Sequence, residues 1–174
     1  MIKRGLILCL LFLASSCFNN KIKEIKHLSF DELIINENAS QVNSGFLEGI
    51  TTKDFGDFLL KNNFKNKDNQ TEFIFSEKDA TYKVIIDGNE KLKSIEFYSY
   101  SKLNSLEKAL VFFKQAAKIS IPQTDTLKIK TWTEGNMKII NEKFSRATIL
   151  SNIHYIIEQI SLNEFKLTIK KYNS

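Results

Sequence analysis

Residues 71–101 read TEFIFSEKDATYKVIIDGNEKLKSIEFYSYS, and apolar and polar side chains alternate in three successive stretches of this segment. A period of two is typical of antiparallel strands with one buried face. Asp87-Gly88-Asn89 separates the second stretch from the third and is a strong signal for a tight hairpin. The segment therefore predicts a three-stranded antiparallel meander.

A helix is expected immediately before the meander. Thr51 or Thr52 can cap it, Asp54 lies in its first turn, and it should end near Asn62-Asn63. Its apolar residues, at positions i, i+3 and i+4, are Phe55, Phe58 and Leu59. Further upstream, the spacing of Ser29 and Glu32 is that of a capping box, which predicts a short helix through about Ile35.

A second main helix is expected after the meander. Asn104 and Glu107 have the spacing of a helix start, and Pro122 lies just beyond the expected end. The apolar stripe of this helix is predicted to be Leu106, Ala109, Leu110, Phe113 and Ala117.

A second run of strands is expected downstream. The stretches TLKIKTWT (126–133) and MKIINEKF (137–144) are predicted as a hairpin that turns at residues 134–136. HYIIEQIS and EFKLTIKKY are predicted as strands joined around Leu162-Asn163. For residues 145–153 a strand, a bulge and a short helical turn all remain open.

The predicted fold class is α+β, with two layers: an antiparallel sheet packed under two main helices. The element order is roughly α-β-β-β-α-β-β-β, and a further strand depends on residues 145–153. We predict one globular domain over residues 29–174. The side chains expected to point into its core are Phe73, Phe75, Tyr82, Val84, Ile86, Leu127, Ile129, Phe165, Leu167 and Ile169.

The first residues have the three parts of a secretory leader. Lys3 and Arg4 supply positive charge, residues 6–13 are apolar, and Ala14-Ser15-Ser16 is a run of small residues. The apolar stretch is too short to cross a bilayer, which takes roughly 20 residues as a helix. We predict a signal peptide over residues 1–16.

Ser15-Ser16-Cys17 resembles the lipobox of bacterial lipoproteins, although Ala14 stands where that motif most often has Leu. The resemblance covers residues 1–17 only. It implies cleavage before Cys17, acylation of that cysteine, and a lipid-anchored location in the cell envelope, facing the periplasm or on the cell surface.

Two other readings of the leader stay open, namely plain secretion after a general signal peptidase cut and a cytoplasmic protein with a chance apolar start. The only other cysteine is Cys9, inside the leader, so an unacylated Cys17 would be a single unpaired thiol in an oxidising compartment. This favours acylation. Residues 17–28 would then form a lipid-anchored tether of up to about 35 Å, unless Ile22 and Ile25 dock on the domain as a strand.

The charge of the chain is mild. The formal net charge is +5, and removal of Lys3 and Arg4 with the leader reduces it to about +3 (5 − 2). Apart from Arg4 the sole arginine is Arg146. Because arginine makes the bidentate contacts of most nucleic-acid readers, no nucleic-acid partner is expected.

We find no motif for catalysis, for a metal ion or for a cofactor, and we predict none of these. The two histidines, His27 and His154, have no second ligand at metal spacing. An enzyme, perhaps a hydrolase, would need His154 to meet a carboxylate such as that of Glu158.

A partner-binding face is predicted on the side of the sheet opposite the core. If Ile95 and Phe97 point inward, Tyr98 and Tyr100 point outward. If residues 126–133 form a strand, Lys128, Lys130 and Trp132 share that outer face. Lysines with Tyr and Trp favour an anionic or protein partner. The simpler alternative is a solvated sheet face with Trp132 under a loop.

The leading functional prediction is a membrane-anchored, non-enzymatic envelope lipoprotein. Its partners would be the membrane, through the lipid on Cys17, and a protein or other envelope component, as for an assembly factor, an inhibitor or immunity protein, or a scaffold. A carrier of lipid or small hydrophobic ligands is the first alternative, since the 14 phenylalanines could line a cavity. A hydrolase is the second.

Overall fold

The computed structural model describes residues 28–30, 33, 35–36, 39, 45–67, 71–140 and 145–172. Its helices are α1 (Thr52–Lys61), α2 (Ser105–Ala116) and α3 (Thr126–Met137). Its strands are β1 (Lys65–Asn66), β2 (Glu72–Ser76), β3 (Ala80–Asp87), β4 (Ser94–Ser101), β5 (Arg146–Leu150), β6 (Ile153–Ser161) and β7 (Glu164–Lys171). The predicted signal peptide, Cys17 and the predicted tether up to His27 lie outside the described residues.

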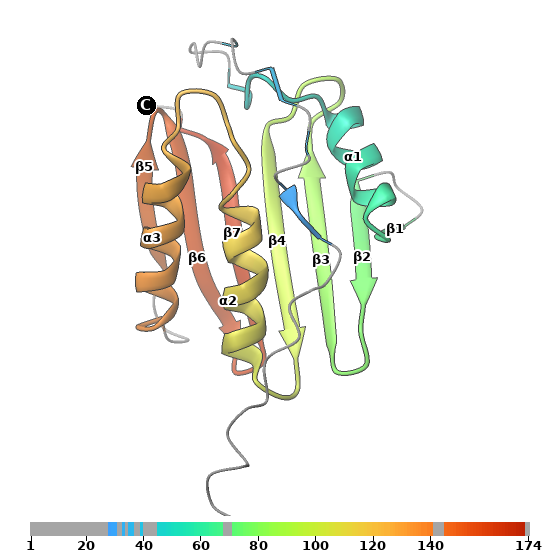
Figure 1. Cartoon of the computed structure of the whole chain (residues 1–174), viewed down its shortest axis with the longest axis vertical. Coiled ribbons are helices and arrows are strands. Elements are labelled where there is room, and N and C mark those ends of the chain that lie inside the picture. Colours follow the sequence, from blue (N-terminus) through green and yellow to red (C-terminus); the bar gives the residue numbers. More distant parts are fainter. Residues whose placement is uncertain are drawn as a thin grey trace, which may run out of the picture.

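The strands form one antiparallel sheet in the order β1-β2-β3-β4-β7-β6-β5. The three helices lie on one face of this sheet (Figure 1). Two meanders, β2-β3-β4 and β7-β6-β5, are joined by antiparallel pairing of β4 with β7. The predicted two-layer α+β architecture is therefore confirmed, with a third helix that was not expected.

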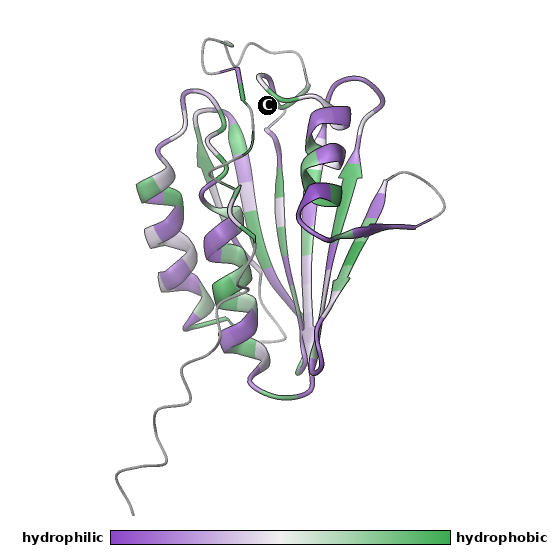
Figure 2. Cartoon of the chain, turned by 45° about the vertical axis from the view of Figure 1, so that its right-hand side comes forward, coloured by the Kyte–Doolittle hydropathy of each residue, from purple (hydrophilic) through white to green (hydrophobic). Residues whose placement is uncertain are grey.

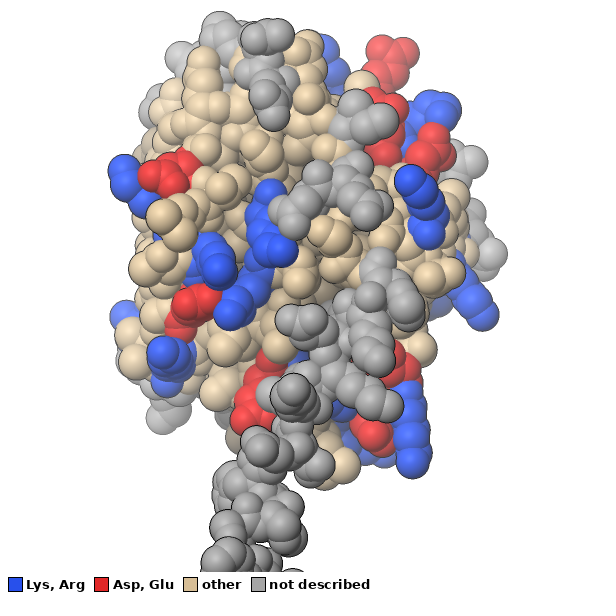
Figure 3. Space-filling model, in the orientation of Figure 1, with Lys and Arg blue, Asp and Glu red and all other residues tan. Residues whose placement is uncertain are grey.

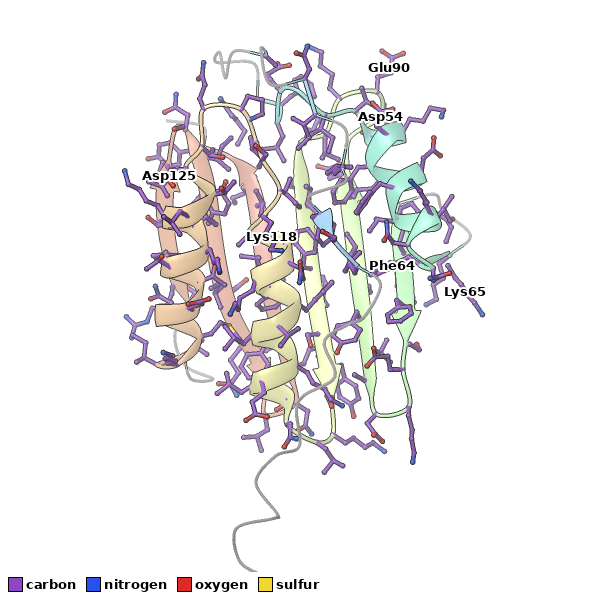
Figure 4. All side chains as sticks on the ribbon, in the orientation of Figure 1. Asp54, Phe64, Lys65, Glu90, Lys118 and Asp125 are labelled. Carbon is purple, nitrogen blue, oxygen red and sulfur yellow. The ribbon has the colours of Figure 1, made fainter. Side chains whose placement is uncertain are left out.

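The first meander is confirmed, but its tight hairpin is wrong. Asp87 pairs with Ser94, so a loop over residues 88–93 joins β3 to β4. Within this loop Leu92 is fully buried, and Glu90 accepts a backbone hydrogen bond from Thr52 at 3.2 Å. Figure 4 accordingly shows Glu90 at the same end of the molecule as Asp54 in the first turn of α1. The loop is longer than a two-residue hairpin turn, so it can place Leu92 in the core and form a hydrogen bond with the start of α1.

The second meander is closer to expectation. Ser161 pairs with Glu164 across the predicted turn at Leu162-Asn163, after a bulge between Gln159 and Ser161. For residues 145–153 the structure shows strand β5 followed by a turn. Ser151 and Asn152 both have positive φ, +49° and +62°, as a type I′ hairpin requires.

The strand predicted over residues 126–133 is wrong, because this segment is helix α3. Asp125 caps the helix by accepting a hydrogen bond from the backbone N–H of Lys128 at 3.0 Å. Ile129, Thr133 and Met137 are buried at a spacing of four, which is a helical stripe. The turn expected at residues 134–136 lies inside the helix, and residues 138–140 form no strand.

The other two helices agree with their predicted starts. In α1 the Thr51 hydroxyl accepts from the Asp54 N–H at 3.0 Å, and the predicted apolar face is buried. Of the predicted apolar stripe of α2, Ala109, Phe113 and the C-cap Ala117 are buried and Leu110 is partly buried. Phe112 and Ala116, which were not predicted, are buried as well. Phe112 turns toward the sheet because its ring packs on Tyr82, with centroids 4.9 Å apart, and this leaves Leu106 exposed.

The chain upstream of α1 completes the core. Leu28, Phe30, Leu33 and Leu47 are buried, and Figure 1 shows the segment 28–30 in the gap between α1 and α2. Leu28 was predicted to end the tether, yet it belongs to the domain. The predicted capping box includes Asp31 and Glu32, which lie outside the described residues.

Most predicted core positions in the strands are confirmed. Buried are Phe73, Tyr82, Val84, Ile86, Phe165, Leu167 and Ile169. Phe75 is only partly buried. Ile129 is buried as part of a helix, whereas Leu127 is 70% exposed, contrary to expectation.

Candidate interaction surfaces

The sheet has one face without a covering layer in the described structure. Because all three helices lie on the other side (Figures 1 and 2), the side chains of this face meet no helix. We call it the open face. Its central residues, from β3 across to β6, are Lys83, Ile85, Glu96, Tyr98, Tyr100, His154, Ile156, Glu158, Lys166 and Thr168.

Tyr98 lies at the centre of the open face in a fixed geometry. The Lys83 ammonium lies over its ring, 4.3 Å from the centroid, and the Tyr98 hydroxyl donates to Glu96 Oε2 at 2.7 Å. Burial, and then the hydrogen bond to Glu96, raise the pKa of Tyr98 above its ordinary value. The hydroxyl is therefore protonated and donates a hydrogen bond. The Lys83 ammonium lies over the ring of Tyr98, and the Glu96 carboxylate binds its hydroxyl.

The open face continues from β4 onto β7 and β6, where charged side chains are again paired. Lys166 pairs with Tyr98 in the β4–β7 register, and its ammonium lies 2.7 Å from Glu158 Oε2. Tyr100, at the end of β4, is opposite Glu164 and is 39% exposed. The two tyrosines lie on the outer face as predicted, within a field of paired charges rather than a positive one.

The other three predicted site residues lie elsewhere. Lys128, Lys130 and Trp132 are on α3, in the helical layer, so they share no surface with Tyr98 and Tyr100. The prediction of one five-residue face is wrong, because it depended on reading residues 126–133 as a strand.

Nearby carboxylates partly neutralise the positive charge of the lysines around α3. Lys128 Nζ lies 3.6 Å from Asp125 Oδ2. Lys114 of α2 lies 2.8 Å from Glu134 Oε1, and this hydrogen bond, with smaller effects of Lys130 and Lys138, lowers the pKa of Glu134. Figure 3 shows the result, with acidic side chains interspersed among lysines on the helix side of the molecule.

Trp132 belongs to a second candidate surface. A shallow groove of about 480 Å³ follows the outer flank of α3 and is lined by Leu127, Lys128, Thr131, Trp132, Gly135 and Asn136. Asn136 Nδ2 donates to the Trp132 carbonyl at 2.8 Å. Gly135 faces open space, because a Cβ there would meet nothing within 4 Å. We call this the α3 groove.

A third surface was missed by sequence reasoning. Leu103 in the β4–α2 loop is 63% exposed, Leu106 in the first turn of α2 is 40% exposed, and Leu162 in the β6–β7 turn is 73% exposed. We call these three residues the leucine end. The signal that could have revealed it is leucine at turn and loop positions, in SKLNSL and SLNE, where polar residues are usual.

His154 lies on the open face without a carboxylate partner in the described structure. Its ring packs edge-on against Tyr172 at 5.8 Å, and Lys170 is its register partner. Desolvation, and then the charge of Lys170, lower the pKa of His154. Glu158, four residues along the same strand and thus roughly 13 Å away, is engaged by Lys166.

The phenylalanines build a packed interior. Phe30, Phe55 and Phe97 meet with centroids 5.6–6.4 Å apart, and Phe112 joins Phe97 at 5.7 Å. Such spacings are those of aromatic rings in direct contact. Among the described residues these rings therefore pack against one another between the helices and the sheet.

The described residues include no group of three or more His, Cys, Asp or Glu side chains able to hold a metal ion. No helix among them has the length and apolar character needed to cross a membrane. Comparisons with protein-family models, with curated proteins and with solved structures find no match for this chain.

Proposed function

We propose that the protein is a lipid-anchored envelope protein that binds a macromolecular partner through the open face around Tyr98 and Tyr100. The observation that carries the proposal is the arrangement of Lys83, Tyr98 and Glu96. An aromatic ring is held there between a cation and an anion, on a sheet face that none of the described helices covers.

Prearranged side chains favour binding because little conformational freedom remains to be lost on association. Tyrosine is enriched among the residues that dominate interface energies. Since Glu96, Glu158 and Glu164 lie among the lysines of the open face, a protein surface with charges of both signs fits better than a polyanion. The proposed partner is therefore another protein of the envelope.

The proposed anchor is the lipid on Cys17. A single acyl chain holds a protein only marginally, and two or more chains make the attachment durable. The residues between Cys17 and the buried Leu28 would keep the domain within about 35 Å of the bilayer. The partner is thus expected at or near the same membrane.

Site-specific photo-crosslinking in the cells that make the protein tests the proposed surface. A photoreactive amino acid replaces Tyr100 on the open face, Thr131 in the α3 groove, or Leu60 on α1, the last being a control that is 49% exposed. We expect one discrete adduct from position 100 and none from position 60. An adduct from position 131 alone would move the site to the α3 groove, and equal adducts from all three positions would contradict a specific site.

A further inference from the structure

Exposed apolar side chains concentrate at one end of the sheet. Of the ten large apolar residues that are exposed in the described structure, five lie around the β4–α2 loop and the β6–β7 turn. They are Tyr100, Leu103, Leu106, Ile160 and Leu162. Figure 2 shows hydrophobic colour in the loop at this lower end of the molecule.

Hydrogen bonds hold the leucine end in place. The Ser105 hydroxyl donates to the carbonyl oxygen of Leu162 at 3.0 Å, and the Ser101 N–H donates to that of Asn163 at 3.0 Å. The Ser101 hydroxyl also donates to the Leu103 carbonyl at 2.7 Å. These hydrogen bonds join the β4–α2 loop and the start of α2, which carry Leu103 and Leu106, to the β6–β7 turn, which carries Leu162. The exposure of the three leucines is therefore a fixed feature of the fold.

The described residues upstream of α1 give the direction in which the chain enters the domain. Phe30 packs on Phe97, midway along β4, and the chain then reaches Asn36, whose N–H donates to the Gly49 carbonyl at 2.8 Å. Gly49 lies two residues before Thr51, which forms a β-bridge with Lys91 in the β3–β4 loop, at the end of the sheet opposite Ser101. From Phe30 to Asn36 the chain therefore moves away from the leucine end, and a tether that joins the domain upstream of Phe30 would begin nearer that end.

Lysines are not in excess over carboxylates near the leucine end. Lys78, Lys102 and Lys108 are accompanied by Glu77, Asp79, Glu107 and Glu164 in the neighbouring loops and first turns. A surface that bound lipid headgroups by charge would need an excess of lysine. The chemistry of this end is that of apolar insertion.

From these observations we propose that the leucine end inserts into the boundary between headgroups and acyl chains of the bilayer that holds the protein. The inference rests on the proposed lipid anchor, because three partly exposed leucines alone make a weak attachment. Insertion would stand the strands along the membrane normal. The open face would then point sideways, toward partners in the same membrane.

Depth-dependent quenching tests this orientation in the membrane-extracted protein, reconstituted into vesicles of phosphatidylethanolamine and phosphatidylglycerol. A fluorophore is attached to Leu162→Cys at the leucine end or to Asn89→Cys in the β3–β4 loop at the opposite end. With brominated acyl chains in the bilayer, we expect at least threefold more quenching at position 162 than at position 89. The difference should persist at about 0.5 M salt, where charge interactions are screened. Equal quenching at both positions, or a difference that salt abolishes, would overturn the proposal.

Matched substitutions show whether the leucines themselves are responsible. Leu103→Asp together with Leu106→Asp should reduce quenching at position 162 to the level at position 89, and unchanged quenching would contradict insertion. Leu60→Asp together with Leu127→Asp, which are also at exposed sites, should have no effect. Urea unfolding of each variant shows that the fold is intact. The intact mass of the same sample shows separately whether Cys17 is acylated. An unacylated protein would refute the proposed anchor, whereas the quenching experiment decides the proposed orientation.

Discussion

Phe30 lies edge-on against Phe97 at the centre of the sheet, with ring centroids 5.6 Å apart and ring planes at 90°. Phe30 also packs on Phe55 and Phe58 of α1. Phe30 is therefore part of the core, and a tether that starts at a lipid anchor on Cys17 would join the folded domain at the buried Leu28.

Replacement of Phe30 by alanine should destabilise the whole domain. The side chain is 1% exposed and contacts three other rings, so the cavity that remains should lower the free energy of unfolding by about 3–5 kcal/mol. Urea unfolding followed by circular dichroism measures the loss. Leu60→Ala, on the exposed side of α1, should change it by less than about 0.5 kcal/mol. A similarly small change for Phe30→Ala would show that the segment is not packed in the core.

Gly135→Ala should stabilise the protein. Gly135 is inside α3, and a Cβ there would meet nothing within 4 Å, so alanine should add about 0.5–1 kcal/mol through its higher helix propensity. The matched control is Gly56→Ala in α1, where a Cβ would lie 3.2 Å from Cζ of Phe73 and the gain should be lost. Destabilisation by Gly135→Ala would contradict the helical assignment of residues 126–137.

Acid should weaken the fold partly through His154. The native pKa of His154 is lowered by desolvation first and by Lys170 second, so below about pH 6.5 the unfolded chain takes up a proton that the folded chain resists. Stability therefore falls as the pH drops from that value toward the lower native pKa. His154→Gln should remove part of the loss in urea midpoint between about pH 7.5 and 5.5. An identical loss in the variant would contradict the shift.

An NMR titration of His154 separates the two causes of its lowered pKa. Lys170→Gln should raise the native pKa only part of the way toward the ordinary value, since desolvation is the larger cause. Lys166→Gln, on the same strand but paired with Glu158, should leave it unchanged. Complete restoration by Lys170→Gln would show that charge dominates instead.

Tyr100→Ala should weaken binding of the partner captured at position 100 by tenfold or more, which corresponds to about 1.4 kcal/mol. Tyr172 is the matched control, because it has the same exposed fraction of 39% and lies at the opposite end of the same face. Tyr172→Ala should leave the affinity within about threefold. Surface plasmon resonance with the purified partner measures both. Equal losses would argue against a site centred on Tyr98 and Tyr100.

The strands were the most predictable part of the fold. Period-two alternation located β2, β3, β4, β6 and β7, since each strand buries one face against the helices. The same rule failed for LKIKTWT, where alternation coincides with the four-residue spacing of Ile129 and Thr133. The cap at Asp125 was the local signal for a helix, and packing of α3 on α2 and β6 decided between the two patterns.

The candidate sites were predictable only where the fold was. Tyr98 and Tyr100 were placed correctly because the strand parity of β4 fixes their face. The predicted position of Lys128, Lys130 and Trp132 was wrong because residues 126–133 were read as a strand. These residues lie on α3, in the helical layer, and not on the open face. The hydrogen bonds from Ser105 to Leu162 and from Ser101 to Asn163 bring the leucine end together, and each joins residues about 60 positions apart in the sequence. A local sequence pattern cannot predict such contacts.

Acylation of Cys17 is the claim on which the proposed location and orientation both rest. The intact mass of the protein extracted from membranes tests it most directly. We predict the mass of the chain that begins at Cys17 plus on the order of several hundred daltons of diacylglycerol and acyl groups. An unmodified chain, or one that still carries Met1, would contradict it.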